Sequence, residues 1–351
     1  MRSGSTDKLF LRRSNILPAG GESDGTVLSC NMILARNITG YPFPQAAPVQ
    51  AREEIARKVF AAAEECGDFS RFDIDPLLPS ERQMLCERRL ADSVAASSLA
   101  GSCAGVAVSD DEKLSVLVNG EDHLHITVNA PGMKLRELWH NANSFDDLMG
   151  KKLDYVFDHK RGFLTARPEI SGTGMRASVI VHLPGLVMTD KLDATRSGLY
   201  ELGFDFQSTY SNDRYDPGNI YTISNRITLG ESEGQIIDQL CAAVADIAGF
   251  EKNAREEILA SDRNRILDFA GKAYGVLKYS YKLSYVEAMQ NLSGLMLGAE
   301  LQLFRELDVD AVNTLFISSM PGHLQKLAQK ELDLDEAKAF RATMFRSKTG
   351  K

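Results

Sequence analysis

The residues of this chain that could carry chemistry gather in two short segments, one around Glu121 and His125 and the other around Arg167 and Arg176. Carboxylates orient guanidinium groups, and arginines neutralise phosphate oxygens. No Ser-His-Asp arrangement, metal-ligand spacing or GxxxxGK[ST] nucleotide loop accompanies these residues. Residue types alone therefore assign no reaction, and Glu121 by itself is typical of a solvated turn.

Alternating apolar and polar residues predict the strands that would position these side chains. Residues 114–118 and 123–128 alternate on either side of an Asn-Gly turn, which favours a hairpin with Glu121 at its tip. Residues 176–183 and 219–225 alternate as further strands. A Gly-Thr-Gly sequence before residue 176 bends the backbone sharply.

Helices are predicted from apolar spacing and from capping boxes. One precedes the Gly-Thr-Gly bend and uses Phe145, Leu148, Leu153, Val156 and Phe157, with a short strand at 163–165 after it. Others cover 49–66, the segment from Ser80 to Leu90, and a long helix capped by Ser232 and Gln235. Beyond about residue 256 every pattern is helical, near 262–279, 284–304 (with Ser284 and Glu287 as its capping box), 308–319 and 323–346.

These patterns predict an α+β fold in three parts. Residues 1–26 form a flexible arm, residues 27–255 form a domain with helices around a mostly antiparallel sheet, and residues 256–351 form an all-helical domain.

Composition narrows the class of protein. With 44% hydrophobic and 25% charged residues, the 351-residue chain is typical of a soluble globular protein. Its net charge of -8 argues against nucleic-acid binding. The five cysteines never form a CxxC pair, which predicts reduced thiols and no metal site. Without a signal peptide or an 18-residue apolar run, the expected location is the cytoplasm, away from membranes.

Several motifs together carry a resemblance. Residues 172–178 read Gly-Thr-Gly-Met-Arg-Ala-Ser, and the strand after them ends His-Leu-Pro. With Asn-Gly-Glu-Asp-His-Leu-His-Ile at 119–126, this resembles the ATP:guanido phosphotransferases (phosphagen kinases), and most closely their protein arginine kinase branch. The helical tail, with Pro-Gly-His-Leu-Gln-Lys-Leu at 321–327, resembles that branch and is absent from the metabolite kinases. The resemblance implies a phosphagen kinase fold and ATP-dependent phosphoryl transfer to arginine.

The resemblance also implies site positions, and most of them are substituted here. Of five arginines that hold ATP phosphates in the family, only Arg176 remains, and the others correspond to Asn31, Ile33, His125 and Leu202. A family histidine near the nucleotide corresponds to Arg89, whereas Arg36 matches a family arginine with an expected structural role.

The positions that the resemblance assigns to binding the substrate guanidinium are also substituted. Glu121 retains one of the two carboxylates that hold the substrate guanidinium, but the second corresponds to Gln207 and the reactive cysteine to Arg167. The alignment of residues 203–217 contains an insertion, so a substitute carboxylate or cation remains open among Asp205, Asp213, Asp216 and Arg214.

These losses predict a catalytically degenerate kinase. Each charge-assisted hydrogen bond contributes roughly 1.5–3 kcal/mol, so four losses remove about 6–12 kcal/mol if they are additive. We therefore expect a binding or regulatory protein in protein quality control. The alternative is an active protein-arginine kinase that binds Mg-ATP in a site rewired around Glu121, Arg176, Arg167 and the inserted loop.

Partners follow mainly from the resemblance. It implies a zinc-binding activator protein and a Clp-type unfoldase. The 284–304 helix has apolar residues on more than one face, which predicts either a homodimer through the helical domain or a helix central to its own bundle.

Overall fold

The computed structural model describes residues 1–11, 25–97, 101–211, 213–304 and 309–349. Its strands are β1 (Arg2–Ser3), β2 (Val27–Arg36), β3 (Phe69–Asp73), β4 (Gly105–Ser109), β5 (Leu114–Val118), β6 (Leu124–Pro131), β7 (Phe157–Asp158), β8 (Gly162–Phe163), β9 (Met175–His182), β10 (Phe204–Ser208) and β11 (Ile220–Asn225). The helices that precede the C-terminal domain are α1 (Thr6–Leu11), α2 (Val49–Cys66), α3 (Pro79–Glu87), α4 (Ser93–Ala96), α5 (Leu135–Gly150), α6 (Pro184–Met188), α7 (Leu192–Glu201) and α8 (Glu233–Ser261). The C-terminal helices are α9 (Arg263–Tyr279), α10 (Tyr285–Glu300), α11 (Val309–Ser319), α12 (Pro321–Ala328) and α13 (Leu334–Thr349).

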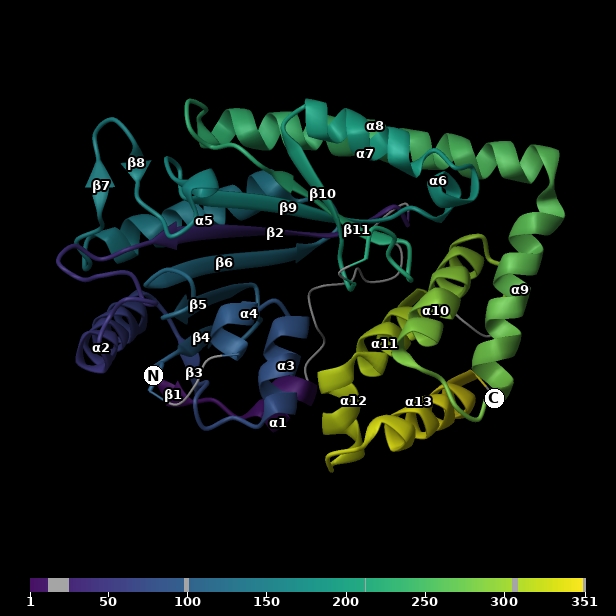
Figure 1. Cartoon of the computed structure of the whole chain (residues 1–351), viewed down its shortest axis with the longest axis horizontal. Helices are drawn as coiled ribbons and strands as arrows, with labels where there is room; N and C mark the ends of the chain where they lie inside the picture. Colours follow the sequence, from purple (N-terminus) through teal and green to yellow (C-terminus); the bar gives the residue numbers. More distant parts are fainter. Residues whose placement is uncertain (12–24, 98–100, 212, 305–308, 350–351) are drawn as a thin grey trace.

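A nine-stranded sheet in the order β1-β3-β4-β5-β6-β2-β9-β11-β10 organises the first domain (Figure 1). Every neighbouring pair is antiparallel except β1 with β3. Beyond α8, the described residues contain helices and no strand. The predicted α+β fold class is confirmed.

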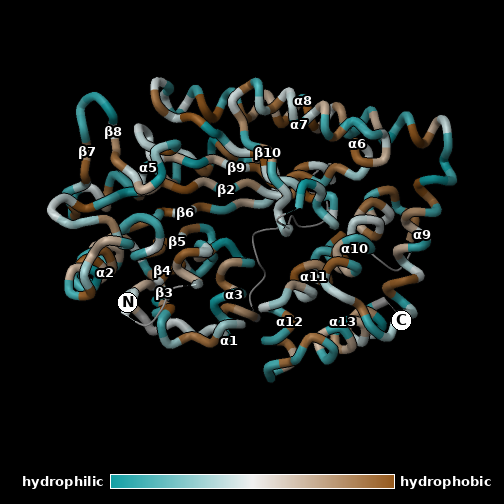
Figure 2. The backbone as a smooth tube through the Cα atoms, in the orientation of Figure 1, coloured by the Kyte–Doolittle hydropathy of each residue, from teal (hydrophilic) through white to brown (hydrophobic). Residues whose placement is uncertain are grey.

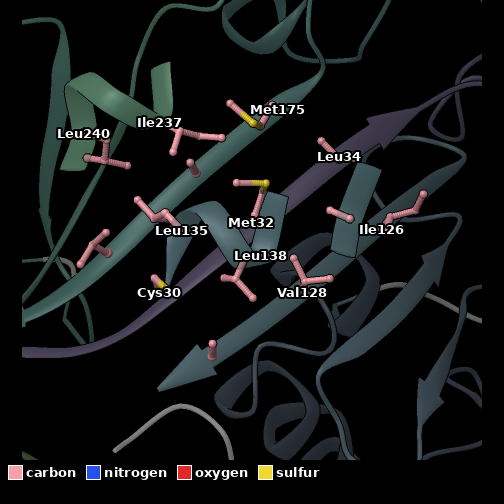
Figure 3. Packing of buried hydrophobic residues seen from close by; sticks show 14 of the residues in the cluster. Cys30, Met32, Leu34, Ile126, Val128, Leu135, Leu138, Met175, Ile237 and Leu240 are labelled. Atoms are coloured by element: carbon pink, nitrogen blue, oxygen red, sulfur yellow. The ribbon is translucent and has the colours of Figure 1, made fainter. Parts of the chain in front are cut away.

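The two faces of this sheet differ in polarity because strand residues alternate in direction. Met32 and Leu34 of β2 point to one face, where they pack with Leu138 of α5 and Ile237 of α8 in the main core (Figure 3). The opposite face carries polar side chains from the central strands. This second face holds most of the positions at which the resemblance places phosphate-binding arginines.

The C-terminal helices form a second core, which also includes Leu28, Ile180 and Ile220 from the sheet. Hydrophobic residues recur along α10 and α11 (Figure 2), and Met289, Leu292 and Leu295 of α10 are fully buried. Most apolar residues of α10 are thus buried within this chain, whereas Val286 is 51% exposed. A homodimer through this helix stays a prediction.

Several predicted boundaries are wrong for local reasons. The helix expected through Phe157 ends at Gly150, because residues 154–156 run extended beside residues 37–39, where Val156 N donates to Asn37 O at 2.7 Å. The helix expected over 323–346 is two helices, because Gln329 adopts a left-handed conformation with φ 55° that ends α12.

The start and end of α3 also differ from the prediction. Leu78 is its N-cap and Glu81 accepts a hydrogen bond from the Leu78 amide, so Ser80 does not cap the helix. The helix stops at Glu87, just before Arg89 with its left-handed φ of 56°. The capping boxes at Ser232 and Ser284 are present as predicted.

The structure also bears on the expected N-terminal arm and on the expected domain boundary near residue 255. Residues 12–24 of the expected arm lie outside the described residues, whereas β1 pairs with β3 and Leu9 of α1 is buried, so this part differs from a loose arm. The long helix α8 runs continuously through the expected boundary at 255.

Across the described ranges, no helix combines the length and apolar character needed to span a membrane.

Candidate functional site

Glu121 and Arg167 meet at one end of the sheet. Glu121 lies in the turn between β5 and β6, and Arg167 lies in the loop that follows β8. The Arg167 Nε atom lies 2.8 Å from Oε1 and 2.7 Å from Oε2 of Glu121. The Glu121 carboxylate, which the resemblance assigns to the substrate guanidinium, therefore already holds a guanidinium group of the same chain.

Asp122 fixes the loop that carries Arg167. Its buried Oδ1 accepts hydrogen bonds from Ala166 N at 2.7 Å and from Asn37 Nδ2 at 2.6 Å. Thr165 Oγ1 then donates to the Arg167 carbonyl at 2.6 Å. Because Asp122 is the neighbour of Glu121, the carboxylate and the arginine that it pairs with are anchored to the same point.

His125 lies between two carboxylates. Its Nε2 is 3.1 Å from Asp122 Oδ2 and its Nδ1 is 3.5 Å from Asp92 Oδ2. Burial opposes its positive charge, but Asp122, Asp92 and Glu121 outweigh burial and raise the pKa of His125. The same pairing lowers the pKa of Asp122 although burial opposes that shift. His125 is therefore protonated more readily than a free histidine, and a proton on it is met by the carboxylates of Asp122 and Asp92.

The remaining phosphate-side positions line the polar sheet face. Ile33 stands directly opposite Arg176 in the register of β2 with β9. Arg176 donates to Ser224 Oγ at 2.9 Å and to Asp205 Oδ2 at 3.4 Å. Asn31, two residues along the strand from Ile33, accepts a hydrogen bond from Arg89 at 3.2 Å. This face thus brings together Asn31, Ile33 and Arg176 but leaves Arg176 engaged by a carboxylate.

Two predicted positions lie apart from these residues. Leu202 caps the C-terminus of α7, is 66% exposed and lines a groove between α7 and α8 with Leu199 and Phe250. Gln207 is exposed on the edge strand β10, where it pairs with Thr222. Neither contacts Glu121 or Arg167 through a hydrogen bond in the described part of the chain.

The four residues that could replace the lost carboxylate or cation, in β10 and the loop after it, have different partners. Asp216 is buried and organises the loop by accepting from Ser208 Oγ at 2.7 Å and from Tyr210 N at 2.9 Å. Arg214 forms an exposed ion pair with Asp193 at 2.9 Å, and Asp213 accepts only from Ser211 at 3.1 Å among the described contacts. Asp205, through Arg176, is the member of this set that reaches the polar face.

Arg36 has the structural role expected of it. Its guanidinium is buried, pairs with Asp146 at 2.6 Å and donates to the Thr173 carbonyl at 3.0 Å. A side chain at Gly174, which has φ 65°, would meet Arg36 NH1 at 2.4 Å and the Ala35 carbonyl at 2.7 Å. The Gly-Thr-Gly bend is therefore required by packing against Arg36.

Sequence reasoning missed Asp92 and Asp122. Asp122 lies inside the Asn-Gly-Glu-Asp-His string, so its position was a usable signal. Asp92 gave none, because it lies 33 positions before His125 and its local role is to cap α4 through Ala95 N at 2.7 Å. Within the described residues no group of three His, Cys, Asp or Glu side chains could hold a metal ion.

The fold and the site together define a class of protein. Lombricine kinase has the same fold, with a TM-score of 0.58 at 20% identity over 69% of this chain and 70% of that chain. A duplicated taurocyamine kinase from Schistosoma mansoni gives a TM-score of 0.58 at 21% identity, over 68% of this chain and 35% of that one. The structure thus has the phosphagen kinase fold.

Sequence comparisons give the family. The model of the ATP:guanido phosphotransferase C-terminal catalytic domain matches residues 51–254, and that of the protein-arginine kinase McsB C-terminal domain matches residues 263–351. A protein-arginine kinase of Moorella thermoacetica is 38% identical over 95% of this chain and 97% of that protein. Another from Halothermothrix orenii is 35% identical over 94% of each chain. The chain belongs to the ATP:guanido phosphotransferase family, in its protein-arginine kinase branch.

Proposed function

We propose that this protein is a catalytically degenerate member of its family that acts by binding or regulation instead of phosphoryl transfer. The observation that carries this proposal is the ion pair between Arg167 and Glu121. Arg167 offers Glu121 the chemical group of an arginine substrate, but its own loop is anchored through Asp122. A substrate arginine would have to displace it.

Charge around the guanidinium position supports the same conclusion. Glu121, Asp122 and Asp92 supply three carboxylates, against Arg167 and, when it is protonated, His125. The remaining negative charge opposes the approach of a triphosphate. His125 cannot replace a phosphate-binding arginine while two carboxylates hold it.

The positions of the five family arginines offer no free cation in the described part of the chain, although Arg89, at the position of the family histidine, bonds only the neutral Asn31 there. Asn31 and Ile33 are uncharged, and Arg176 donates to Ser224 and Asp205. Leu202 is an exposed leucine at the end of α7. Since phosphoryl transfer without a P-loop depends on arginines that neutralise the triphosphate, this arrangement supports weak nucleotide binding.

The second candidate is an active protein-arginine kinase with a rewired nucleotide site. The names of the relatives favour it, since proteins 33–38% identical to this chain are called protein-arginine kinases. In that case Mg-ATP would bind, and Asp205 and Arg167 would have to release their partners. The zinc-binding activator, the Clp-type unfoldase, the homodimer and the cytoplasmic location stay predictions under either candidate.

Calorimetric titration with Mg-ATP separates the two candidates. The proposal predicts a dissociation constant weaker than about 1 mM, which corresponds to less than about 4 kcal/mol of binding free energy. Binding in the micromolar range by the unmodified protein would favour the active kinase. The Moorella thermoacetica relative serves as the comparison under the same conditions.

A further inference from the structure

A groove with a volume of about 590 Å³ runs between α7 and α8, which lie beside each other in Figure 1. Along α7 it is lined by Ala194, Gly198 and Leu202, and along α8 by Ile247 and Phe250. Residues that recur every three or four positions share one face of a helix. Each of the two helices therefore turns one face toward the groove.

The groove between α7 and α8 is open and apolar. Gly198 has no side chain, and a Cβ atom added there would meet no other atom within 4 Å. Leu202 and Phe250 are 66% and 54% exposed although both are large apolar residues, whereas Leu186 and Leu199 of the same lining are buried. An exposed apolar surface of this kind is typical of a site that binds a partner.

This groove is separate from the transfer site. Leu199 of α7 and Leu240 of α8 belong to the core on the apolar face of the sheet, opposite the polar face. Although the resemblance matches Leu202 to a phosphate-binding arginine, the structure places Leu202 in this layer of helices. A function of the groove therefore goes beyond the proposed function, because it needs none of the residues that would bind nucleotide or guanidinium.

The charge around the groove is negative. Asp246 lines it and Glu201 directly precedes Leu202, and neither carboxylate has an ion pair or a hydrogen bond among the described contacts. Lys191 lines the groove at the start of α7, but its charge is neutralised by Glu257. The C-terminus of α7, which lies at Leu202, adds the negative end of a helix dipole. These features favour a positively charged partner.

We propose that this groove binds an amphipathic helical segment of another protein, with apolar residues on one face and lysines or arginines beside them. Such helices bind apolar grooves through side chains at i, i+3, i+4 and i+7. The ten residues of α7 span about 15 Å, which matches about three turns of a bound helix. The basic side chains would lie near Asp246 and Glu201. A second copy of this chain would bring the same negative charges, and an anionic lipid surface would be repelled.

Fluorescence anisotropy with a labelled peptide of about 15 residues tests the proposal, because shorter isolated helices form poorly in water. The peptide has leucines at helical spacing and lysines beside them. One control peptide has glutamates in place of the lysines, and a second has the same composition in scrambled order. The unmodified protein should bind the lysine peptide with a dissociation constant of about 100 µM or tighter, and both control peptides at least about tenfold more weakly.

Gly198→Phe tests the position of the groove. It should weaken binding of the lysine peptide at least about tenfold, because the new ring fills the groove. Its unfolding temperature should not fall, since glycine is unfavourable within a helix and the ring enters open space. Gly271→Phe is the matched control, because Gly271 is an exposed glycine of α9 with equally open surroundings, and it should leave binding unchanged.

Asp246→Lys tests the charge of the groove. It should weaken binding of the lysine peptide about two- to thirtyfold, since an attraction is lost and a repulsion is gained. Glu331→Lys changes the net charge equally at an exposed position outside the groove, and its effect should be much smaller. This comparison removes the general attraction of a basic peptide to a protein with a net charge of -8.

Four results would overturn the proposal: no binding of the lysine peptide at about 1 mM, equal binding of the scrambled peptide, equal binding by Gly198→Phe, or equal effects of Asp246→Lys and Glu331→Lys. If Gly198→Phe misfolds, Phe250→Ala decides, because Phe250 is exposed, and unchanged affinity in that variant counts against the groove.

Two further measurements distinguish other occupants of the groove. Light scattering that shows a dimer of the unmodified protein and a monomer of Gly198→Phe would assign the groove to a second copy of this chain. Binding to phosphatidylcholine vesicles that Gly198→Phe abolishes would assign it to lipid. Either result would overturn the peptide proposal, whereas phosphoarginine formation would contradict the proposed loss of transfer and leave the groove unaffected.

Discussion

The Nε atom of Arg167 lies 2.7 Å from the Glu121 carboxylate at the tip of the β5–β6 hairpin. The resemblance places a family carboxylate at Glu121 and a reactive cysteine at the position of Arg167. One substitution therefore removes a reactive group and also places a guanidinium on the carboxylate that a substrate needs. The pair is partly exposed, with side-chain exposures of 50% for Arg167 and 22% for Glu121, so it competes with a substrate only modestly.

Removing Arg167 should free Glu121 for an external guanidinium. Partly exposed ion pairs contribute roughly 0.2–1 kcal/mol, so Arg167→Ala should bind an arginine-containing peptide about 1.4- to fivefold more tightly than the unmodified protein. Calorimetric titration with the peptide measures this change. Arg161→Ala, an exposed arginine in the preceding hairpin, is the control and should have no effect. A gain that persists when Glu121→Gln is added to Arg167→Ala would show that the peptide binds elsewhere.

His125 should make stability depend on pH in a specific direction. Its folded-state pKa is raised above 6.5, so its contribution to the free energy of unfolding is complete below 6.5 and is lost as pH rises through the higher folded value. Urea unfolding from about pH 6 to about pH 9 should show a larger loss of stability for the unmodified protein than for His125→Gln. The difference between the two proteins cancels the opposite trend of His123, whose pKa is lowered by burial. Parallel pH curves would exclude the charged His125 described above.

Glu87 should be essential for docking the helical domain. Its buried carboxylate accepts from the backbone amides of Gly322 and His323 and from the His323 ring. Glu87→Gln should lower the free energy of unfolding by about 1.5–3 kcal/mol, since hydrogen bonds to a charged group are lost and an amide faces donors. Glu65→Gln, which removes an exposed partner of Lys152, should change stability by less than about 0.5 kcal/mol. Chemical denaturation compares the two, and equal effects would contradict this role.

Restoring arginines should separate nucleotide binding from transfer. Arginine at Asn31, Ile33 and His125 should strengthen Mg-ATP binding, because each adds a cation on or near the polar sheet face. The residue introduced at Ile33 would stand opposite Arg176, so without nucleotide the variant should be less stable than the unmodified protein. Transfer should stay absent until Arg167 and Gln207 are also reverted to cysteine and glutamate. Calorimetry and thermal unfolding with and without Mg-ATP test the first two statements, and transfer by the triple variant would contradict the third.

The sequence predicted those features that depend on local patterns. Alternation located β5, β6, β9 and β11, and the capping boxes at Ser232 and Ser284 located two helix starts. It failed where packing overrides periodicity, as at Leu153, whose buried side chain belongs to the turn after α5 and not to the helix itself. The sequence also could not separate α12 from α13, because the residue with the left-handed conformation that ends α12 is Gln329 and not a glycine, which would have been a recognisable stop signal.

The candidate site was predictable in part. Motifs identified Glu121, Arg176 and the substituted positions, but they could not show which partners these side chains take. The pairing of Arg167 with Glu121 joins residues 46 positions apart, and that of His125 with Asp92 joins strand β6 to the start of α4. The exposed position of Leu202 depends on how α7 packs beside α8, which no local pattern reports.

The central claim is the absence of arginine phosphorylation, and mass spectrometry at neutral pH tests it most directly. The purified protein is incubated with Mg-ATP and an arginine-rich protein substrate, with the Moorella thermoacetica relative as the comparison reaction. The account predicts no phosphoarginine from this protein, because Arg167 occupies Glu121 and the phosphate-side arginines are missing. Phosphoarginine formed by the unmodified protein, and lost in Glu121→Gln, would contradict the account and establish an active site rewired around Arg167.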